Sequence, residues 1–151
     1  MEVTSMDMSF REKSAWACLV TTGVVFIPYF TFIFQLASKG ELILPRVIVA
    51  FVAAVLAQIV LSSVYMTVIA LSTRQEPRDE RDLAIENRAF RSAHWVLVVA
   101  LWLLVLGGVM LTPVFPKLIS VAFVGQLALL SFVLSELVHY ATLVYSYRRG
   151  Y

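Results

Sequence analysis

Four long apolar segments, separated by short polar ones, set the pattern of the chain. They cover residues 15–36, 45–71, 94–111 and 117–145. Each is close to the roughly 20 residues that a helix needs to cross the hydrocarbon core of a membrane. The apolar runs are continuous and lack the alternation of a membrane β-barrel. The pattern predicts an all-α integral membrane four-helix bundle that forms a single domain over residues 1–151.

One long polar segment, residues 74–94, interrupts this pattern. It holds five of the twelve Lys and Arg residues and five of the ten acids. Pro77 suits a first helical turn, and the acids after it favour a helix N-terminus. Because no Gly or Pro follows until Gly107, we expect one helix over residues 77–111. Its first four or five turns should project into the cytoplasm or lie at the membrane surface.

This polar helix carries an apolar stripe formed by Ile85, Ala89 and Ala93. An apolar stripe on a charged helix needs a partner surface, which can be lipid headgroups, the other cytoplasmic helix ends or a second protomer. Two interpretations stay open: a solvated helix with basic topology signals, or a docking element toward a protomer or another protein. The predicted interaction motif consists of Asp79, Glu80, Arg81, Asp82, Ile85, Arg88, Ala89 and Ala93.

Residues 79–89 match the pattern D-E-R-x-x-x-I-x-x-x-A. The pattern resembles the signature of an uncharacterised family, a domain of unknown function, of small prokaryotic membrane proteins. Members of that family have about four spans, with the motif just before the third. The resemblance implies a protein of a prokaryotic inner membrane and supplies no activity.

The composition supports a membrane protein, since 60% of the residues are hydrophobic and only 15% are charged. Soluble domains carry about 25% charged residues, so we expect the lipid bilayer to cover most of this chain. The net charge of +2 is small and the basic residues flank apolar segments, which excludes a nucleic-acid partner. The single cysteine, Cys18, cannot form an intramolecular disulfide and is expected to be structural.

The distribution of basic residues predicts the orientation. Nine Lys and Arg residues lie in the N-terminal segment, the polar segment and the C-terminus, against three in the two other loops. Loops rich in Lys and Arg stay in the cytoplasm. We therefore expect both termini and the central loop on the cytoplasmic side of the cell inner membrane.

A second candidate site lies within the spans. Charged residues inside a membrane are costly and mark function by default; the clear case here is Glu136. The cluster predicted around it consists of Glu136, His139, Tyr140, Ser62, Ser63, Tyr65 and Gln58. Three interpretations compete: a hydrogen-bonded structural carboxyl group, a proton or cation relay, and metal or haem ligation. The last is the weakest, because a di-metal site needs a second Glu-x-x-His motif and further carboxylates.

These observations lead to one functional hypothesis and an alternative. The first is a non-enzymatic accessory, regulatory or sensing component, homo-oligomeric with a dimer favoured, that acts through its cytoplasmic helix. A cytoplasmic or membrane protein partner fits this role. The alternative is a small oligomeric proton- or cation-coupled transporter or channel that uses Glu136 and His139. The sequence names no catalytic residue, metal site or cofactor, so an enzyme is the third choice.

Overall fold

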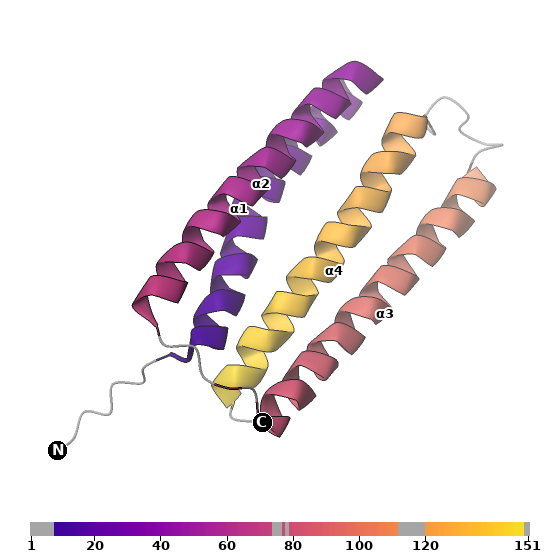
Figure 1. Ribbon diagram of the computed structural model, residues 1–151. Coiled ribbons are helices and arrows are strands. Elements are labelled where there is room, and N and C mark those ends of the chain that lie inside the picture. Colours follow the sequence, from indigo (N-terminus) through magenta and orange to yellow (C-terminus); the bar gives the residue numbers. More distant parts are fainter. Residues whose placement is uncertain (1–7, 74–76, 78, 112–119, 150–151) are drawn as a thin grey trace.

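The computed structural model describes residues 8–73, 77, 79–111 and 120–149, which form four long helices (Figure 1). They are α1 (Phe10–Ser38), α2 (Leu44–Ser72), α3 (Glu80–Leu111) and α4 (Val121–Arg149). All four are long and apolar enough to cross a membrane. The all-α class and the four apolar helices predicted from the sequence are confirmed. The connection before α4, with the predicted start of the fourth segment at residue 117, lies outside the described residues.

Local signals explain where α1 and α2 begin and end. The Ser9 side chain caps α1 by accepting a hydrogen bond from the Glu12 N–H at 3.2 Å, so the helix starts five residues before the expected position 15. Gly40 has a φ of +69°, the left-handed conformation that commonly closes a helix. Pro45 then lies in the first turn of α2, where its missing N–H costs nothing.

Helix α3 runs without a break over 32 residues, which confirms the expected continuity of the polar segment with the third span. It begins at Glu80, and Pro77 precedes it. Two aspartates explain this start: the Asp82 N–H donates to Asp79 Oδ1 at 2.7 Å, and the Asp79 N–H donates to Asp82 Oδ2 at 3.3 Å. This is a reciprocal capping box built from two aspartates.

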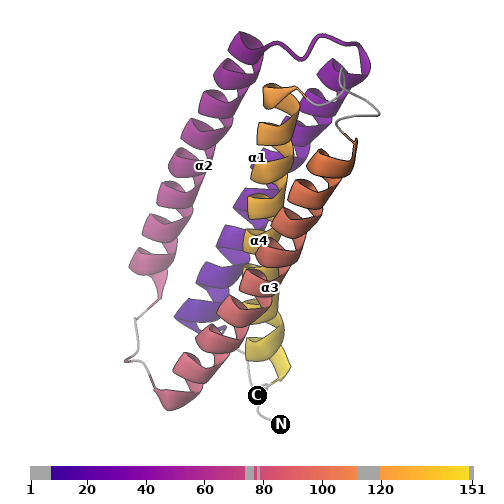
Figure 2. The same ribbon diagram turned by 90° about the vertical axis from the view of Figure 1, so that its right-hand side faces the viewer.

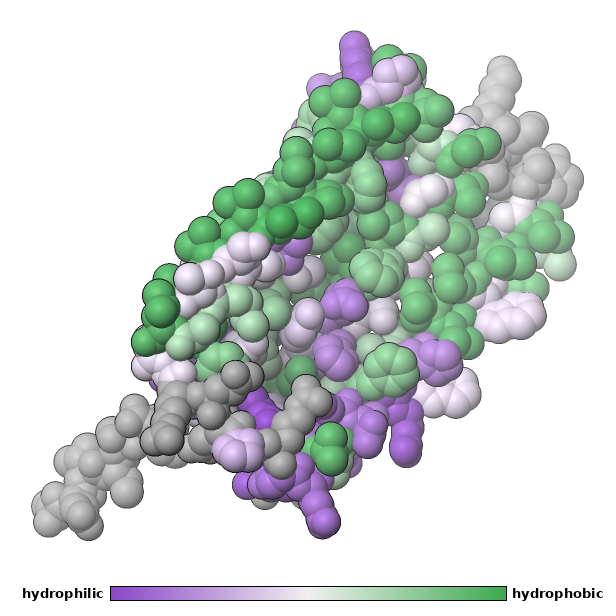
Figure 3. Space-filling view, viewed as in Figure 1, coloured by the Kyte–Doolittle hydropathy of each residue, from purple (hydrophilic) through white to green (hydrophobic). Residues whose placement is uncertain are grey.

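The helices form an open antiparallel row in the order α2–α1–α4–α3. Helix α2 packs on α1, α1 on α4 and α4 on α3, and the other pairs of described helices touch marginally or not at all (Figures 1 and 2). The two edge helices, α2 and α3, each pack on one neighbour and are therefore the least buried. In its most apolar stretch, α2 is 11% buried and α3 is 6% buried, against 28% for α1. Large hydrophobic side chains are exposed along all four helices, and Figure 3 shows the apolar surface that they form on one face of the row. This surface indicates contact with a lipid bilayer.

Aromatic and aliphatic side chains of α1 form the core with α2 and α4. Its buried members are Tyr29, Phe30, Ile33, Val47, Ala54 and Val133. Within this core the Tyr29 hydroxyl donates to Gln126 Oε1 at 2.6 Å, which satisfies both polar groups away from water.

Polar contacts between helices gather at one end of the row, where α1 and α3 begin and α2 and α4 end. We call it the basic end, because Arg11, Lys13, Arg148 and Arg149 lie there. Hydrophilic side chains cluster at this end (Figure 3). The Arg148 guanidinium contacts Glu12 at 3.4 Å. Helices α1 and α4 thus reach as far as α3 does, and the first turns of α3 lie along α4 instead of standing clear of it.

Candidate functional site

The carboxylate of Asp82 joins three helices at the basic end. Arg11 Nη1 of α1 lies 2.8 Å from Asp82 Oδ2, and the Tyr147 hydroxyl of α4 donates to Asp82 Oδ1 at 3.1 Å. The Arg11 and Asp82 side chains are only 19% and 17% exposed. The contact with Arg11 is an ion pair, and a hydrogen bond to a charged group, as from Tyr147, contributes about 1.5–3 kcal/mol. The acidic start of the motif therefore links α1, α3 and α4 in addition to capping α3.

The apolar stripe is buried within the chain. Ile85, Ala89 and Ala93 are 4%, 0% and 7% exposed, and the Ser135 hydroxyl of α4 donates to the Ala93 carbonyl at 3.0 Å. Of the three partner surfaces considered, the structure provides the neighbouring helix ends. These three side chains are therefore not available for docking to another protein. Their inclusion in the predicted interaction motif is wrong.

The remaining motif residues face outward. Glu80, Arg81 and Arg88 are exposed, and both arginines have interaction partners. Next to them Leu83 and Phe90 are 46% and 68% exposed. An accessible part of the motif therefore remains, and it consists of charged and apolar side chains on the outer faces of α3.

The intramembrane cluster predicted from the sequence divides into two. On one side of α1, the Tyr140 side chain lies close to Glu136 and to Cys18 of α1. The His139 ring meets the Tyr140 ring edge to face, with centroids 5.2 Å apart. Cys18 thus belongs to the polar site, which the sequence did not indicate.

On the other side of α1, Gln58 Nε2 donates to Thr22 Oγ1 at 3.2 Å and to Ser62 Oγ at 3.3 Å. Ser63 and Tyr65 are exposed. The expected convergence of the α2 side chains on Glu136 is wrong, because α2 packs on α1 and has at most a marginal contact with α4. Counting turns along a helix gives the depth of a side chain but not which neighbour it faces.

The packing also fixes the level of Glu136. Because Ser135 contacts Ala93 and Tyr147 contacts Asp82, residues 135–147 of α4 lie beside residues 82–93 of α3. Glu136 is therefore level with the charged part of α3. The boundaries expected for the third and fourth spans, residues 94 and 145, cannot both hold for helices packed side by side.

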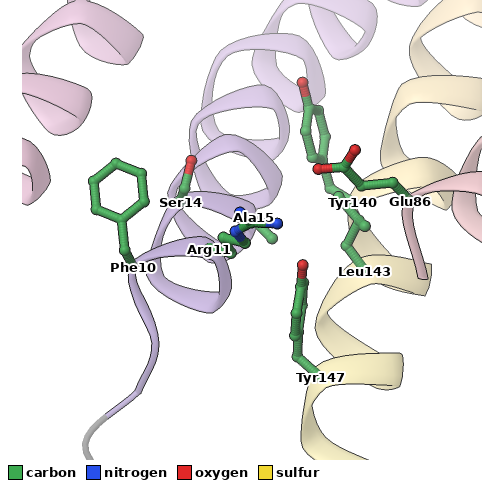
Figure 4. Close-up of a pocket in the computed structure, with 8 residues that line it drawn as sticks. All are labelled: Phe10, Arg11, Ser14, Ala15, Glu86, Tyr140, Leu143 and Tyr147. Carbon is green, nitrogen blue, oxygen red and sulfur yellow. The ribbon is translucent and has the colours of Figure 1, made fainter. Parts of the chain in front are cut away.

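A cavity of about 200 Å³ opens beside these groups at the basic end (Figure 4). Its walls come from α1, α3 and α4, and Glu86 reaches into it from α3 toward α1 (Figure 4). Through Tyr140 the cavity connects to Glu136 and Cys18. The lining residues are Phe10, Arg11, Ser14, Ala15, Glu86, Tyr140, Leu143 and Tyr147.

Sequence reasoning missed Arg11 and Tyr147 as members of the site. Both lie close to helix ends with basic and aromatic residues, which looked like ordinary topology signals and membrane anchors. No local pattern pairs either residue with Asp82, because the contacts join distant parts of the chain. Their only signal was that all three lie at helix ends expected on the same side of the membrane.

The charged groups have a one-sided distribution along the helices. Asp, Glu, His, Lys and Arg are absent from residues 14–38, 47–72, 95–111 and 121–135. Toward the other end, Ser131 donates to its own helix at the Leu127 carbonyl, and Gln126 bonds Tyr29. Within the described residues, no group of three or more His, Cys, Asp and Glu side chains could hold a metal ion. The polar site thus opens toward one end and does not continue as a charged path.

Fold and composition together define an α-helical multi-pass membrane protein with a polar site at one end. No family model, no curated protein and no solved structure matches the chain.

Proposed function

We propose that the chain is a small non-enzymatic membrane protein that acts as an accessory, regulatory or sensing component. Its working part is the basic end. The observation that carries this proposal is the convergence of α1, α3 and α4 on Asp82 beside an open polar cavity. A small molecule bound in this cavity would contact α1, α3 and α4 at once, so its binding would affect the packing of all three helices.

The alternative, a proton- or cation-coupled transporter using Glu136 and His139, has less support. Transport needs a route with exchangeable groups or water across the whole span. Glu136 and His139 lie near the basic end, and beyond them the described helices hold no Asp, Glu, His, Lys or Arg except Arg46 in the first turn of α2. The Ser131 hydroxyl proton is already donated to a backbone carbonyl.

Proton flux in liposomes separates these two functions. Purified protein reconstituted with an internal pH-sensitive dye should show no more flux under an imposed potential than empty liposomes do. Glu136→Gln should not differ from the unchanged chain. A flux that is well above the empty liposomes and disappears in folded Glu136→Gln would refute the accessory role and establish the transporter.

The proposal places the basic end in the cytoplasm and the chain in a prokaryotic inner membrane, as the resemblance to the uncharacterised family implies. The excess of Lys and Arg at this end supports the orientation. A cysteine at exposed Ser38 should react with a membrane-impermeant maleimide in intact cells, whereas one at exposed Asn87 should react only after permeabilisation. Cys18 is replaced by alanine in both variants. The opposite labelling pattern would reverse the orientation.

We further propose a homo-oligomer, with a dimer favoured. The bare apolar faces of the edge helices support it, because small multi-pass proteins can bury such faces against a second copy as well as against lipid. Light scattering of the detergent-solubilised protein measures the mass of the assembly. A mass of one chain would remove this part of the proposal.

A further inference from the structure

The two edge helices, α2 and α3, carry different side chains on their exposed faces near the basic end. On α2, apolar side chains are exposed up to the last turn, and Leu71 is 85% exposed. Residues 47–72 hold no Asp, Glu, His, Lys or Arg. On α3, the side chains of Arg88 and Arg91 are exposed. At the same end of the row, one edge is therefore apolar and the other is basic.

Contacts between the helices show how these two edges line up. Asp82 of α3 lies beside Arg11 of α1, with 2.8 Å between the charged atoms. The Ser14 hydroxyl of α1 donates to the Met66 sulfur of α2 at 3.3 Å. Arg11 and Ser14 are three residues apart on α1, and each residue of a helix adds about 1.5 Å. Met66 of α2 therefore lies only about one helical turn further from the basic end than Asp82 of α3.

Arg91 lies much further from the basic end. It follows Asp82 by nine residues, which corresponds to about 14 Å along the helix. At that depth α2 exposes Ile59 and Val60, and it remains uncharged from there to Leu71. An arginine can snorkel toward water, but this offset exceeds the length of one side chain. The boundary between charged and apolar surface is therefore stepped between the two edges of the row.

The apolar lengths of the two helices differ in the same way. The uncharged stretch of α2, residues 47–72, is about 39 Å long, whereas that of α3, residues 95–111, is about 25 Å long. The hydrocarbon core of a bilayer is about 30 Å thick. Tilting the row shortens the projection of every helix, so it improves the match of α2 and worsens that of α3. Beside α3, a match requires a thinner bilayer or a protein surface in place of lipid.

The charge on the outer face of α3 distinguishes these two solutions. Residues 87–111 contain no Asp or Glu. Arg88 has a further contact within the chain, and the charge of Arg91 does not depend on it. A second copy related by a twofold axis through this face would place the same arginines opposite each other, and like charges repel. Lipid phosphates complement the charge, because a guanidinium binds a phosphate through two hydrogen bonds.

We infer that phospholipid headgroups lie against the outer face of α3 at Arg88 and Arg91, and that the bilayer is thinner there than beside α2. The phosphates bind the guanidinium groups. The acyl chains begin at Trp95, which is 62% exposed and lies one turn further in, where an interfacial anchor belongs. This lipid contact goes beyond the proposed function and does not depend on it.

Spin labels on the two edges test the step between them. Counting along the helices from the contacts of Asp82 and Met66 places Asn87 of α3 and Ser63 of α2 at about the same level, and both side chains are exposed. Each is replaced by cysteine in a chain that also carries Cys18→Ala. The labelled full chain is reconstituted in liposomes of phosphatidylcholine and phosphatidylglycerol. Power-saturation electron paramagnetic resonance then measures collisions with oxygen, which concentrates in hydrocarbon, and with a water-soluble nickel chelate.

We expect the label on Asn87 to collide with the nickel chelate several-fold more often than the label on Ser63, and the reverse for oxygen. Equal and frequent nickel collisions at both positions would mean that the whole basic end stands in water above a flat bilayer. Frequent oxygen collisions at both would mean that the arginines snorkel from a flat bilayer. Protection of the Asn87 label from both reagents would mean that a second copy covers α3. Each of these three results would overturn the inference.

Variants of the arginines show whether they hold the headgroups. Arg88→Leu combined with Arg91→Leu extends the apolar face of α3, so nickel collisions at the Asn87 label should fall several-fold. The matching pair of lysine substitutions keeps the charge that attracts phosphate and should retain most of the collisions. Arg81→Leu removes an exposed arginine of the same helix on the outer side of Asp82 and should have no effect.

Circular dichroism shows whether each variant is folded. A folded double leucine variant with unchanged nickel collisions would show that the arginines do not hold the headgroups, and the inference would be wrong. If that variant does not fold, the comparison of Asn87 with Ser63 still decides, because both labelled chains keep the arginines. The outcome is also separable from the test of the proposed function, since proton flux through Glu136 does not depend on the lipid beside α3.

Discussion

Replacing Asp82 with alanine is expected to lower the free energy of unfolding by about 3 kcal/mol. The substitution removes a cap of α3, which contributes about 1 kcal/mol. It also removes the acceptor for Arg11 and Tyr147, which link α3 to α1 and α4. The Arg11 guanidinium would be left mostly covered and without this carboxylate, and an uncompensated charge of this kind costs more than an exposed one. Denaturation with sodium dodecyl sulfate in mixed micelles, followed by circular dichroism, measures the change.

Two further variants separate the roles of the carboxylate. Asp79→Ala removes the other half of the capping box and none of the contacts to α1 and α4, so it should cost about 1 kcal/mol. Asp82→Asn keeps hydrogen-bonding atoms but loses the charge, and should fall between the two. If Asp82→Ala costs no more than Asp79→Ala, the carboxylate serves only to cap α3, and the proposed link between three helices is wrong.

The four helices could be predicted from the sequence because lipid leaves few choices. A membrane span must be helical to satisfy its backbone, and it must be about 20 residues long. The continuity of α3 could be predicted for a related reason, since no Gly or Pro interrupts residues 79–106. The Asp79 cap, which shifts the start of α3 to Glu80, could be recognised only from the geometry of the first turn.

The neighbours of each helix could not be predicted. In a soluble protein the apolar side of a helix indicates where the core lies, but the spans here are apolar on every side. Ser62 and Glu136 therefore looked like partners at a comparable depth, although α1 lies between the helices that carry them. The pairing of Arg11 with Asp82 could not be predicted either, because it also depends on which helices are neighbours.

The apolar stripe of Ile85, Ala89 and Ala93 was the exception among these helix faces. Charged residues surround it, so the sequence shows which side of the helix is buried. The need for a partner surface was predicted, and the partner is α4. The sequence could not distinguish α4 from a second protomer, since both would accept the same small and branched side chains. Ala89 is 0% exposed within the single chain, so the partner of the stripe is α4 and not a second protomer.

Enlarging Ala89 to leucine is expected to destabilise the protein by about 3 kcal/mol, at the upper end of the range for overpacked cores. The Ala89 side chain has no exposed surface, so three added carbons have to push α3 away from α4. That movement would also lengthen the hydrogen bond from Ser135 to the Ala93 carbonyl, now 3.0 Å. Denaturation in mixed micelles measures the loss, as for Asp82.

Ala84→Leu provides the matched control, because Ala84 lies on the same helix and is exposed. Leucine and alanine differ little in helix propensity, so this variant should change the free energy of unfolding by less than about 0.5 kcal/mol. If the stripe instead docked on a second protomer, Ala89→Leu would reduce the mass of the assembly and leave the stability of the single chain unchanged. A monomeric, fully stable Ala89→Leu protein would therefore contradict the burial of the stripe against α4. Loss of stability at every protein concentration would support it, because contacts within one chain do not depend on dilution.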